Sequence, residues 1–219
     1  RDRFPQADAD VFHGVMRVDV QIALGLDRDV DARVAREAAI ARGETVAQPQ
    51  RGGGGGRQRV LASQLARARL ATAKYATNLG AAKADGYQIL TRMIPDMGWH
   101  FLNPAIQGFD VTKPPILVYE RHGRSWQLGA LEWVFTAKPA APPLPGATYG
   151  SFAAACHYKD GTFVFTPSQD QCPKRSPQTG AAFNFWHPDL VTLHVWLWYP
   201  NPAGLYSGTN PLVRPFNKG

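Results

Sequence analysis

"ILVYERHGRSWQLGALEWVF", residues 116–135, is the stretch that decides the fold. Residues 116–120 and 125–135 are rich in β-branched and aromatic side chains, and they flank "RHGR", in which Gly123 supplies the turn. Two such runs on either side of a short glycine-containing segment predict an antiparallel β-hairpin. The C-terminal part of the chain is therefore expected to be built around a β-sheet.

Further strands are expected on both sides of this hairpin. From Gln88 onward the pattern becomes β-like, and "MGWHFLNP" (97–104) forms a short segment between two turns. After a proline-rich connection, "SFAAACHY" (151–158) and "TFVFT" (162–166) flank Asp160-Gly161, which predicts a second hairpin. "LVTLHVWLWY" (190–199) is the last strong strand, and an irregular tail with two Asn-Pro turns follows it.

The N-terminal part has helical periodicity. Apolar residues recur at helical spacing over residues 9–24, a second helix is expected to end at Gly43, and a longer one spans residues 58–84. Between them, residues 44–57 contain five consecutive glycines and are expected to form a flexible loop. The fold class is therefore α+β, with N-terminal helices packed on a mainly antiparallel C-terminal sheet or small barrel. Two parts are expected, residues 1–57 and residues 58–219.

Two cysteines, Cys156 and Cys172, enclose the second hairpin. A bridge between them would tie the returning loop to its own hairpin, and disulfides of this kind belong to oxidising compartments. We therefore predict a disulfide and a periplasmic or secreted protein. The alternative is a pair of buried free thiols in a cytosolic protein.

Composition excludes several classes of protein. The 219 residues are 44% hydrophobic and 11% aromatic, enough to build a core, and no apolar stretch is long enough for a transmembrane helix. The formal net charge of +7 permits weak, salt-sensitive attraction to anionic polymers. The basic residues are scattered and do not alternate with tryptophan, so nucleic-acid binding is not expected.

The last strand raises the question of a site. Because side chains alternate between the two faces of a strand, His194 should share a face with Trp196 and Trp198, opposite an aliphatic face. Aromatic side chains around one imidazole are typical of a ligand pocket, to which Trp99 and His187 would contribute. The alternative is a buried structural histidine with a backbone hydrogen-bond partner.

Two more residues suggest a metal. His100 lies between aromatic residues, and Glu132 lies in mid-strand, where an unpaired carboxylate would be costly to bury. Two histidines and a carboxylate are the ligands of many mononuclear transition-metal sites. We therefore predict a metal site at His100, Glu132 and His194, although no short-range motif joins them.

Other chemistry has little support. There is no Gly-x-Ser-x-Gly nucleophile motif. Glu120 and Glu132 could face each other across their hairpin as a glycosidase pair would. His157 follows Cys156 on the same strand and should point to the opposite face, so its side chain is expected to be exposed.

The strings "MGWHFLNP", "ILVYE", "LGALEWVF" and "LHVWLWYPNPAGLYSGTNPLV" resemble a group of uncharacterised exported bacterial proteins, which also share a step similar to Gly86-Tyr87. The resemblance covers about residues 60–215. It implies export and draws attention to His100, Glu132 and His194, but it implies no reaction.

The leading hypothesis is an exported protein whose aromatic-lined pocket binds a transition metal or a small polar ligand through histidine and glutamate side chains. Whether the site catalyses a reaction is left open. The alternative is a non-enzymatic interaction protein that forms a homo-oligomer or docks a partner through its helical half.

Overall fold

The structure is a computed structural model that describes residues 53–216. The helices expected over residues 9–43, and most of the expected glycine-rich loop, lie outside these residues. By its internal contacts the chain divides into two units, Arg1–Ala62 and Ser63–Gly219. The two sheets and the candidate site described below belong to the second unit.

The helical segment before the sheet consists of α3 (Gly53–Thr72), the 3-10 helix η1 (Ala73–Tyr75) and α4 (Leu79–Ala84). The prediction that all five glycines lie in a loop is wrong, since α3 begins at Gly53. The first turn of a helix has no intrahelical bonds for its amide hydrogens to make, and the good helix formers that follow can offset the entropy that these glycines lose.

The single helix predicted over residues 58–84 is broken. The backbone oxygen of Ala76 accepts a hydrogen bond from Leu128 of the sheet, and Asn78 then caps α4 by accepting from the Ala81 amide. Side-chain capping and a sheet contact thus replace the helical bonds at this point. The helical spacing of apolar residues expected over residues 58–84 is nevertheless confirmed from Ala68 onward, where one face forms a buried stripe: Ala68, Thr72, Tyr75, Leu79 and Ala82.

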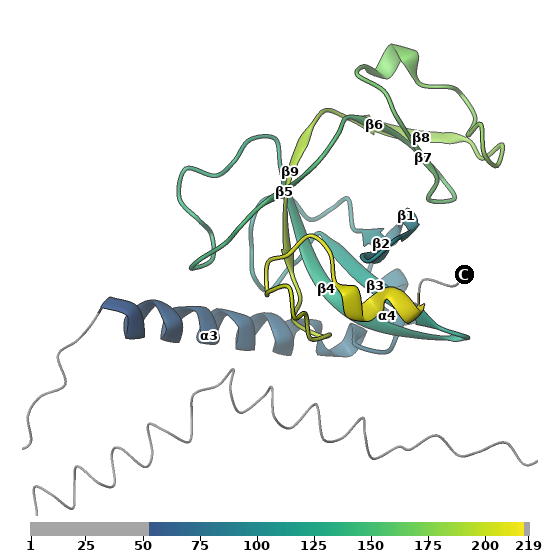
Figure 1. The fold of residues 1–219 in the computed structure, drawn as a ribbon. Helices are drawn as coiled ribbons and strands as arrows, with labels where there is room; N and C mark the ends of the chain where they lie inside the picture. Colours follow the sequence, from purple (N-terminus) through teal and green to yellow (C-terminus); the bar gives the residue numbers. More distant parts are fainter. Residues whose placement is uncertain (1–52, 217–219) are drawn as a thin grey trace, which may run out of the picture. The chain divides into compact units, whose positions relative to one another are not determined.

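The strands form two antiparallel sheets (Figure 1). The larger has the order β1-β2-β3-β4-β9-β5 and the smaller the order β7-β6-β8. The strands are β1 (Gln88–Ile94), β2 (Gly98–Leu102), β3 (Ile116–His122), β4 (Ser125–Phe135), β5 (Gly150–Phe152), β6 (Ala155–Tyr158), β7 (Phe163–Phe165), β8 (Phe183–His187) and β9 (Leu190–Val195). The α+β prediction is confirmed, and the large sheet is curled but open, with β1 and β5 at its edges.

Two strands differ from the expected ones. Residues 151–158 do not form one strand, because β5 pairs with β9 in the large sheet whereas β6 pairs with β7 and β8 in the small one. The last strand ends at Val195 rather than continuing to Tyr199, since the Trp196 amide donates to the Leu205 carbonyl in the tail. The tail ends in the 3-10 helix η3 (Pro211–Phe216).

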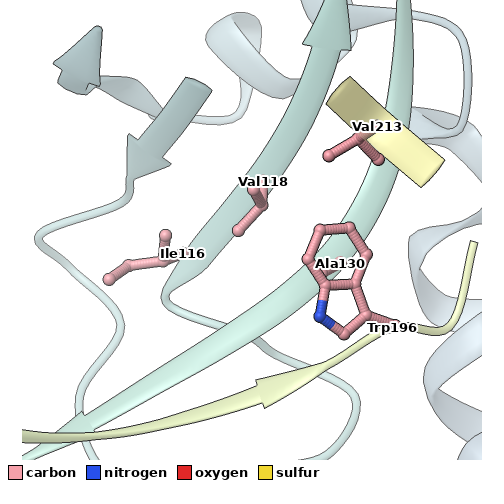
Figure 2. Packing of buried hydrophobic residues seen from close by; sticks show 5 residues of the cluster. All are labelled: Ile116, Val118, Ala130, Trp196 and Val213. Carbon is pink, nitrogen blue, oxygen red and sulfur yellow. The ribbon is translucent and has the colours of Figure 1, made fainter. Parts of the chain in front are cut away.

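The two faces of the large sheet have different partners. One, which we call the helix face, carries Tyr119, whose hydroxyl donates to the backbone oxygen of Tyr75 in η1. The other, which we call the η3 face, carries a buried apolar cluster (Figure 2). Its members are Ile116, Val118, Ala130, Trp196 and Val213 of η3.

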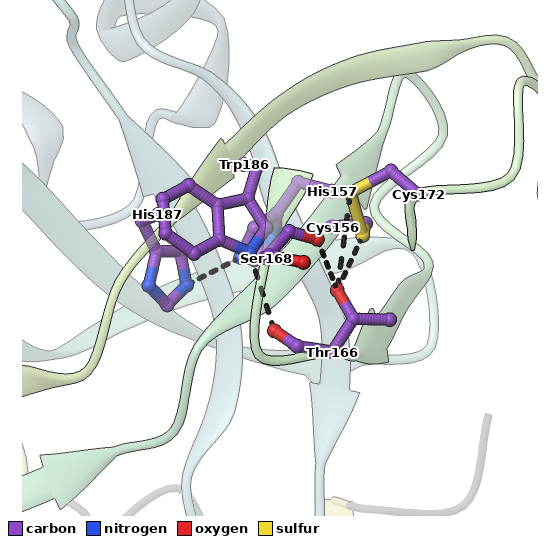
Figure 3. The surroundings of a disulfide bond; sticks show 7 residues. All are labelled: Cys156, His157, Thr166, Ser168, Cys172, Trp186 and His187. Atoms are coloured by element: carbon purple, nitrogen blue, oxygen red, sulfur yellow. Dashed lines mark hydrogen bonds between the residues drawn. A yellow bond between two sulfur atoms is a disulfide. The ribbon is translucent and has the colours of Figure 1, made fainter. Parts of the chain in front are cut away.

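The predicted disulfide is present. Cys156 on β6 and Cys172 are bonded, with an S–S distance of 1.97 Å (Figure 3). The expected hairpin is enclosed by the two cysteines, with Gly161 at φ 81° in the turn between β6 and β7. The bridge therefore fastens the loop after β7 back onto β6.

Within residues 53–216, no helix is both long enough and apolar enough to cross a bilayer.

Candidate metal centre

Strand register places the three candidate ligands, His100, Glu132 and His194, on the η3 face. Glu132 on β4 lies directly opposite His194 on β9, and directly opposed residues share a face. His100 on β2 lies opposite Val118, while Glu132 also lies opposite Ile116. His100 and Glu132 are therefore on the same face with strand β3 between them.

The three side chains converge in the protein interior. His100 Nε2 lies 3.6 Å from Glu132 Oε2, and His194 Nε2 lies 3.4 Å from Glu132 Oε1. All three potential ligand atoms lie within 4.8 Å of one another. Strands two positions apart in a sheet are separated by about 9–10 Å, so the curl of the sheet and the length of the side chains must together bring His100 to Glu132.

The cluster is closed to solvent. His100 is 3% exposed, Glu132 5% and His194 2%. Both Nε2–carboxylate distances exceed the usual length of an N–H···O hydrogen bond, about 2.7–3.2 Å. In a tetrahedral site with metal–ligand distances of about 2.0–2.2 Å, neighbouring ligand atoms are about 3.3–3.5 Å apart. The two nitrogen–oxygen contacts, each to a different carboxylate oxygen, are therefore closer to the spacing of ligands around an ion than to that of hydrogen bonds.

Thr91 on β1 orients the first histidine. Its Oγ1 lies 2.8 Å from His100 Nδ1, and the two residues are paired in the register of β1 and β2. A hydroxyl can accept a hydrogen bond from the ring, which leaves Nε2 with its lone pair directed toward Glu132. A hydrogen-bond partner on the other ring nitrogen is the usual support of a metal-bound histidine.

His194 lacks such a partner. Within the described part of the chain, neither of its buried ring nitrogens makes a hydrogen bond. Leaving a buried polar group unpaired costs about 1–3 kcal/mol, and most buried polar groups do find partners. The expectation that His194 is a structural histidine bonded to a backbone carbonyl is therefore wrong.

Burial shifts all three groups toward their neutral forms. It raises the pKa of Glu132 to about 8, and it lowers the pKa of His194 to about 4. The pKa of His100 falls to about 3, mainly through burial and then through the nearby His194. Neutral imidazoles have free lone pairs, and a cation would offset the cost of ionising Glu132 here. The cluster could hold a metal ion.

The four residues expected to line a pocket are not brought together. Trp196 does lie on the η3 face, in the apolar cluster. The indole nitrogen of Trp198 instead donates to Thr72 Oγ1 on α3, because the alternation stops where β9 ends.

The other two expected pocket residues lie elsewhere. Trp99 packs edge-on against Trp126, 5.5 Å between ring centroids, on the helix face. His187 contacts His157 in the small sheet, with 3.0 Å between their Nε2 atoms. Of the four residues, Trp196 is the one that lies on the same face of the large sheet as His194.

Sequence reasoning misjudged two other residues. His157 is buried, not exposed, because β6 is the central strand of its sheet and both of its faces are covered. Glu120 is also buried, but it pairs with Gln127 and so does not face Glu132 across the hairpin as a glycosidase pair would. Thr91 was missed, since a threonine in a strand has no signal that marks it as a histidine's partner.

Comparisons with protein-family models, with curated proteins and with solved structures found no match to this chain. What the chain does must therefore be inferred from the geometry of the described residues.

Proposed function

We propose that this chain is an exported protein that binds one divalent transition-metal ion through His100 Nε2, Glu132 and His194 Nε2. The observation that carries the proposal is the state of His194, a buried imidazole with neither nitrogen hydrogen-bonded, directed at a buried carboxylate 3.4 Å away. A metal ion coordinated by both the imidazole and the carboxylate would give each buried polar group a partner.

A small polar ligand is a weaker candidate for the same place. The three ligand atoms lie within 4.8 Å of one another and are buried, so one ion could contact all three at once. An ion would also supply the positive charge that Glu132 lacks, since both nearby imidazoles are held neutral by burial.

The ligand set narrows the choice of metal. Two imidazoles and one carboxylate are typical of catalytic zinc sites and of non-haem iron(II) sites. With three protein ligands, at least one coordination position remains for water. A bound zinc would activate that water for hydrolysis, whereas iron(II) would support oxidation. We propose metal binding as the function and these two reactions as the chemistry that the ligands allow.

Export rests on a separate observation. The Cys156–Cys172 disulfide would persist in an oxidising compartment such as the periplasm or the extracellular space. Fractionation of cells that naturally produce the protein tests this part, and recovery of the chain in the cytosol with free thiols would contradict it.

The metal is tested by elemental analysis of the untagged protein, after purification and again after reloading with zinc or iron(II). We expect His194→Ala and Glu132→Gln each to hold about one ion per chain less than the wild type, because each variant removes a ligand of the buried centre. Glu120→Gln is the matched control, because it alters a second buried glutamate on the neighbouring strand outside the cluster. It should retain the metal.

Two results would overturn the proposal. One is a folded wild type that takes up no metal under any of these conditions. The other is a metal content that is unchanged in His194→Ala and Glu132→Gln.

A further inference from the structure

The small sheet contains a second pair of histidines that the candidate metal centre does not use. His157 on β6 lies opposite Phe185 on β8, and His187 lies opposite Ala155, so the histidines are diagonal neighbours on one face. Their Nε2 atoms are 3.0 Å apart, and a dashed line in Figure 3 marks this contact, which starts at the His187 ring and passes behind Trp186.

The outer nitrogen of each ring faces a backbone carbonyl. His157 Nδ1 lies 3.2 Å from the Leu90 oxygen, and His187 Nδ1 lies 2.6 Å from the Pro188 oxygen. A carbonyl oxygen only accepts hydrogen bonds, so each Nδ1 must carry a hydrogen to make its contact. In two neutral rings with that tautomer, both Nε2 atoms present lone pairs to each other.

The pair therefore lacks a positive centre. Three contacts, two to carbonyls and one between the rings, need three hydrogens, but two neutral imidazoles carry only two. Either a third proton or a metal ion between the Nε2 atoms would resolve the conflict. Burial lowers the pKa of His157 to about 4 and also lowers that of His187, which disfavours the third proton at neutral pH.

The spacing suits a metal. With metal–nitrogen distances of about 2.0–2.1 Å, nitrogens 3.0 Å apart subtend roughly 91–97° at the ion. That angle fits adjacent positions in the tetragonal geometry of copper(II), and an expansion of about 0.3 Å would give the tetrahedral angle of zinc. Nδ1–H bonds to backbone carbonyls are also the usual support of metal-bound histidines.

The surroundings hold the rings in place and leave one side accessible. The His157 ring stacks on Phe185, with centroids 4.9 Å apart and planes at 12°. Phe152 lies 5.5 Å from the ring of His187, which is only half-buried. Water can complete the coordination from that side.

We propose that His157 and His187 form a second metal site, separate from the His100–Glu132–His194 centre, which binds a divalent copper or zinc ion through the two Nε2 atoms. This site and the proposed function stand or fall independently, because they share no residue.

The first test uses full-length, untagged, metal-free His194→Asn protein, so that the other centre does not compete. Titration with copper(II), followed by calorimetry and electron paramagnetic resonance, should show one ion per chain with two imidazole nitrogens. Adding His187→Asn should weaken binding about tenfold or more and remove the two-nitrogen signal. Adding His122→Asn instead, at the end of β3 outside both sites, should change neither.

The second test needs no variant that could fail to fold. In ¹⁵N-labelled wild type, the His157 and His187 rings should be Nδ1–H tautomers at neutral pH, and both Nε2 signals should shift when zinc is added. The proposal would be overturned if one ring were an imidazolium, or the two rings shared a proton, and the Nε2 signals did not shift on addition of zinc. So would copper binding that His187→Asn leaves unchanged.

Discussion

Thr91 is the residue through which the orientation of His100 can be tested. Thr91→Val removes the hydroxyl but keeps the side-chain shape, so His100 Nδ1 loses its partner at 2.8 Å. We expect zinc affinity to fall about 10–100-fold, while the metal-free protein loses only about 1 kcal/mol of unfolding free energy. Competition with a zinc-binding dye measures the affinity, and urea unfolding measures the stability.

The control for this prediction is Thr192→Val. Thr192 is also buried and lies two residues before His194 on β9. Thr192→Val should leave the zinc affinity unchanged. An equal loss of zinc affinity in Thr91→Val and Thr192→Val would show that Thr91 has no positioning role.

Glu120 tests the effect of burial on a carboxyl outside the metal centre. Burial raises its pKa to about 8 from the ordinary 4.5, so the folded state holds its proton more tightly than the unfolded state does. Stability contributed by the neutral acid is complete below pH 4.5 and is lost as the pH rises toward 8. The stability of the wild type relative to Glu120→Gln should therefore decline by a few kcal/mol across this range.

Urea unfolding of both proteins with chelator present, from pH 5 to 9, measures that decline. The other titrating groups are the same in both proteins and cancel in the difference. A difference that stays constant with pH would show that Glu120 ionises normally in the folded state.

At the scale of elements, the disulfide is the feature that can be removed cleanly. It joins Cys156 on β6 to a loop residue 16 positions later. Closing a loop of this size in the unfolded chain is expected to contribute about 3 kcal/mol. Reduction, or the Cys156→Ala/Cys172→Ala variant, should lower the free energy of unfolding by about that amount in urea.

The reduced wild type and the double variant should agree, because both remove the same cross-link. A loss below about 0.5 kcal/mol in both would mean that the loop is already restricted without the bridge.

At the scale of the whole molecule, the metal should couple to stability. An ion that binds only the folded chain at 100 times its dissociation constant stabilises it by about 2.7 kcal/mol. For a chain of this size we expect zinc to raise Tm by roughly 5–10 °C and a chelator to reverse the gain. Scanning calorimetry measures the shift, which should be smaller in Glu132→Gln than in the wild type because the buried centre no longer contributes. An equal shift in the two proteins would contradict the coupling.

Self-association or partner docking through the helical half, and attraction to anionic polymers, stay predictions. Much of the expected helical half lies before residue 53, outside the described residues. Light scattering of the full chain and of a chain lacking residues 1–57 would test the first, and salt-dependent binding to an anionic polymer the second.

Much of the architecture could be predicted from local sequence. The hairpin turns at Gly123 and Gly161, the cysteine pair around the second hairpin and the buried stripe from Ala68 onward are all as expected. Each depends on residues near one another along the chain, where turn chemistry and the periods of strands and helices act directly. The residue types of the candidate centre could be chosen in the same way, since buried polar side chains stand out within apolar strands.

Only the tertiary structure decided what those residues meet. His100 reaches Glu132 because the sheet curls across β3, and Glu132 lies opposite His194 because of the register between β4 and β9. Trp198 turns to α3 because the tail ends the last strand early. Register and curl arise from packing between segments far apart in sequence, so no local pattern specifies them, and the candidate centre exists only once the sheet has formed.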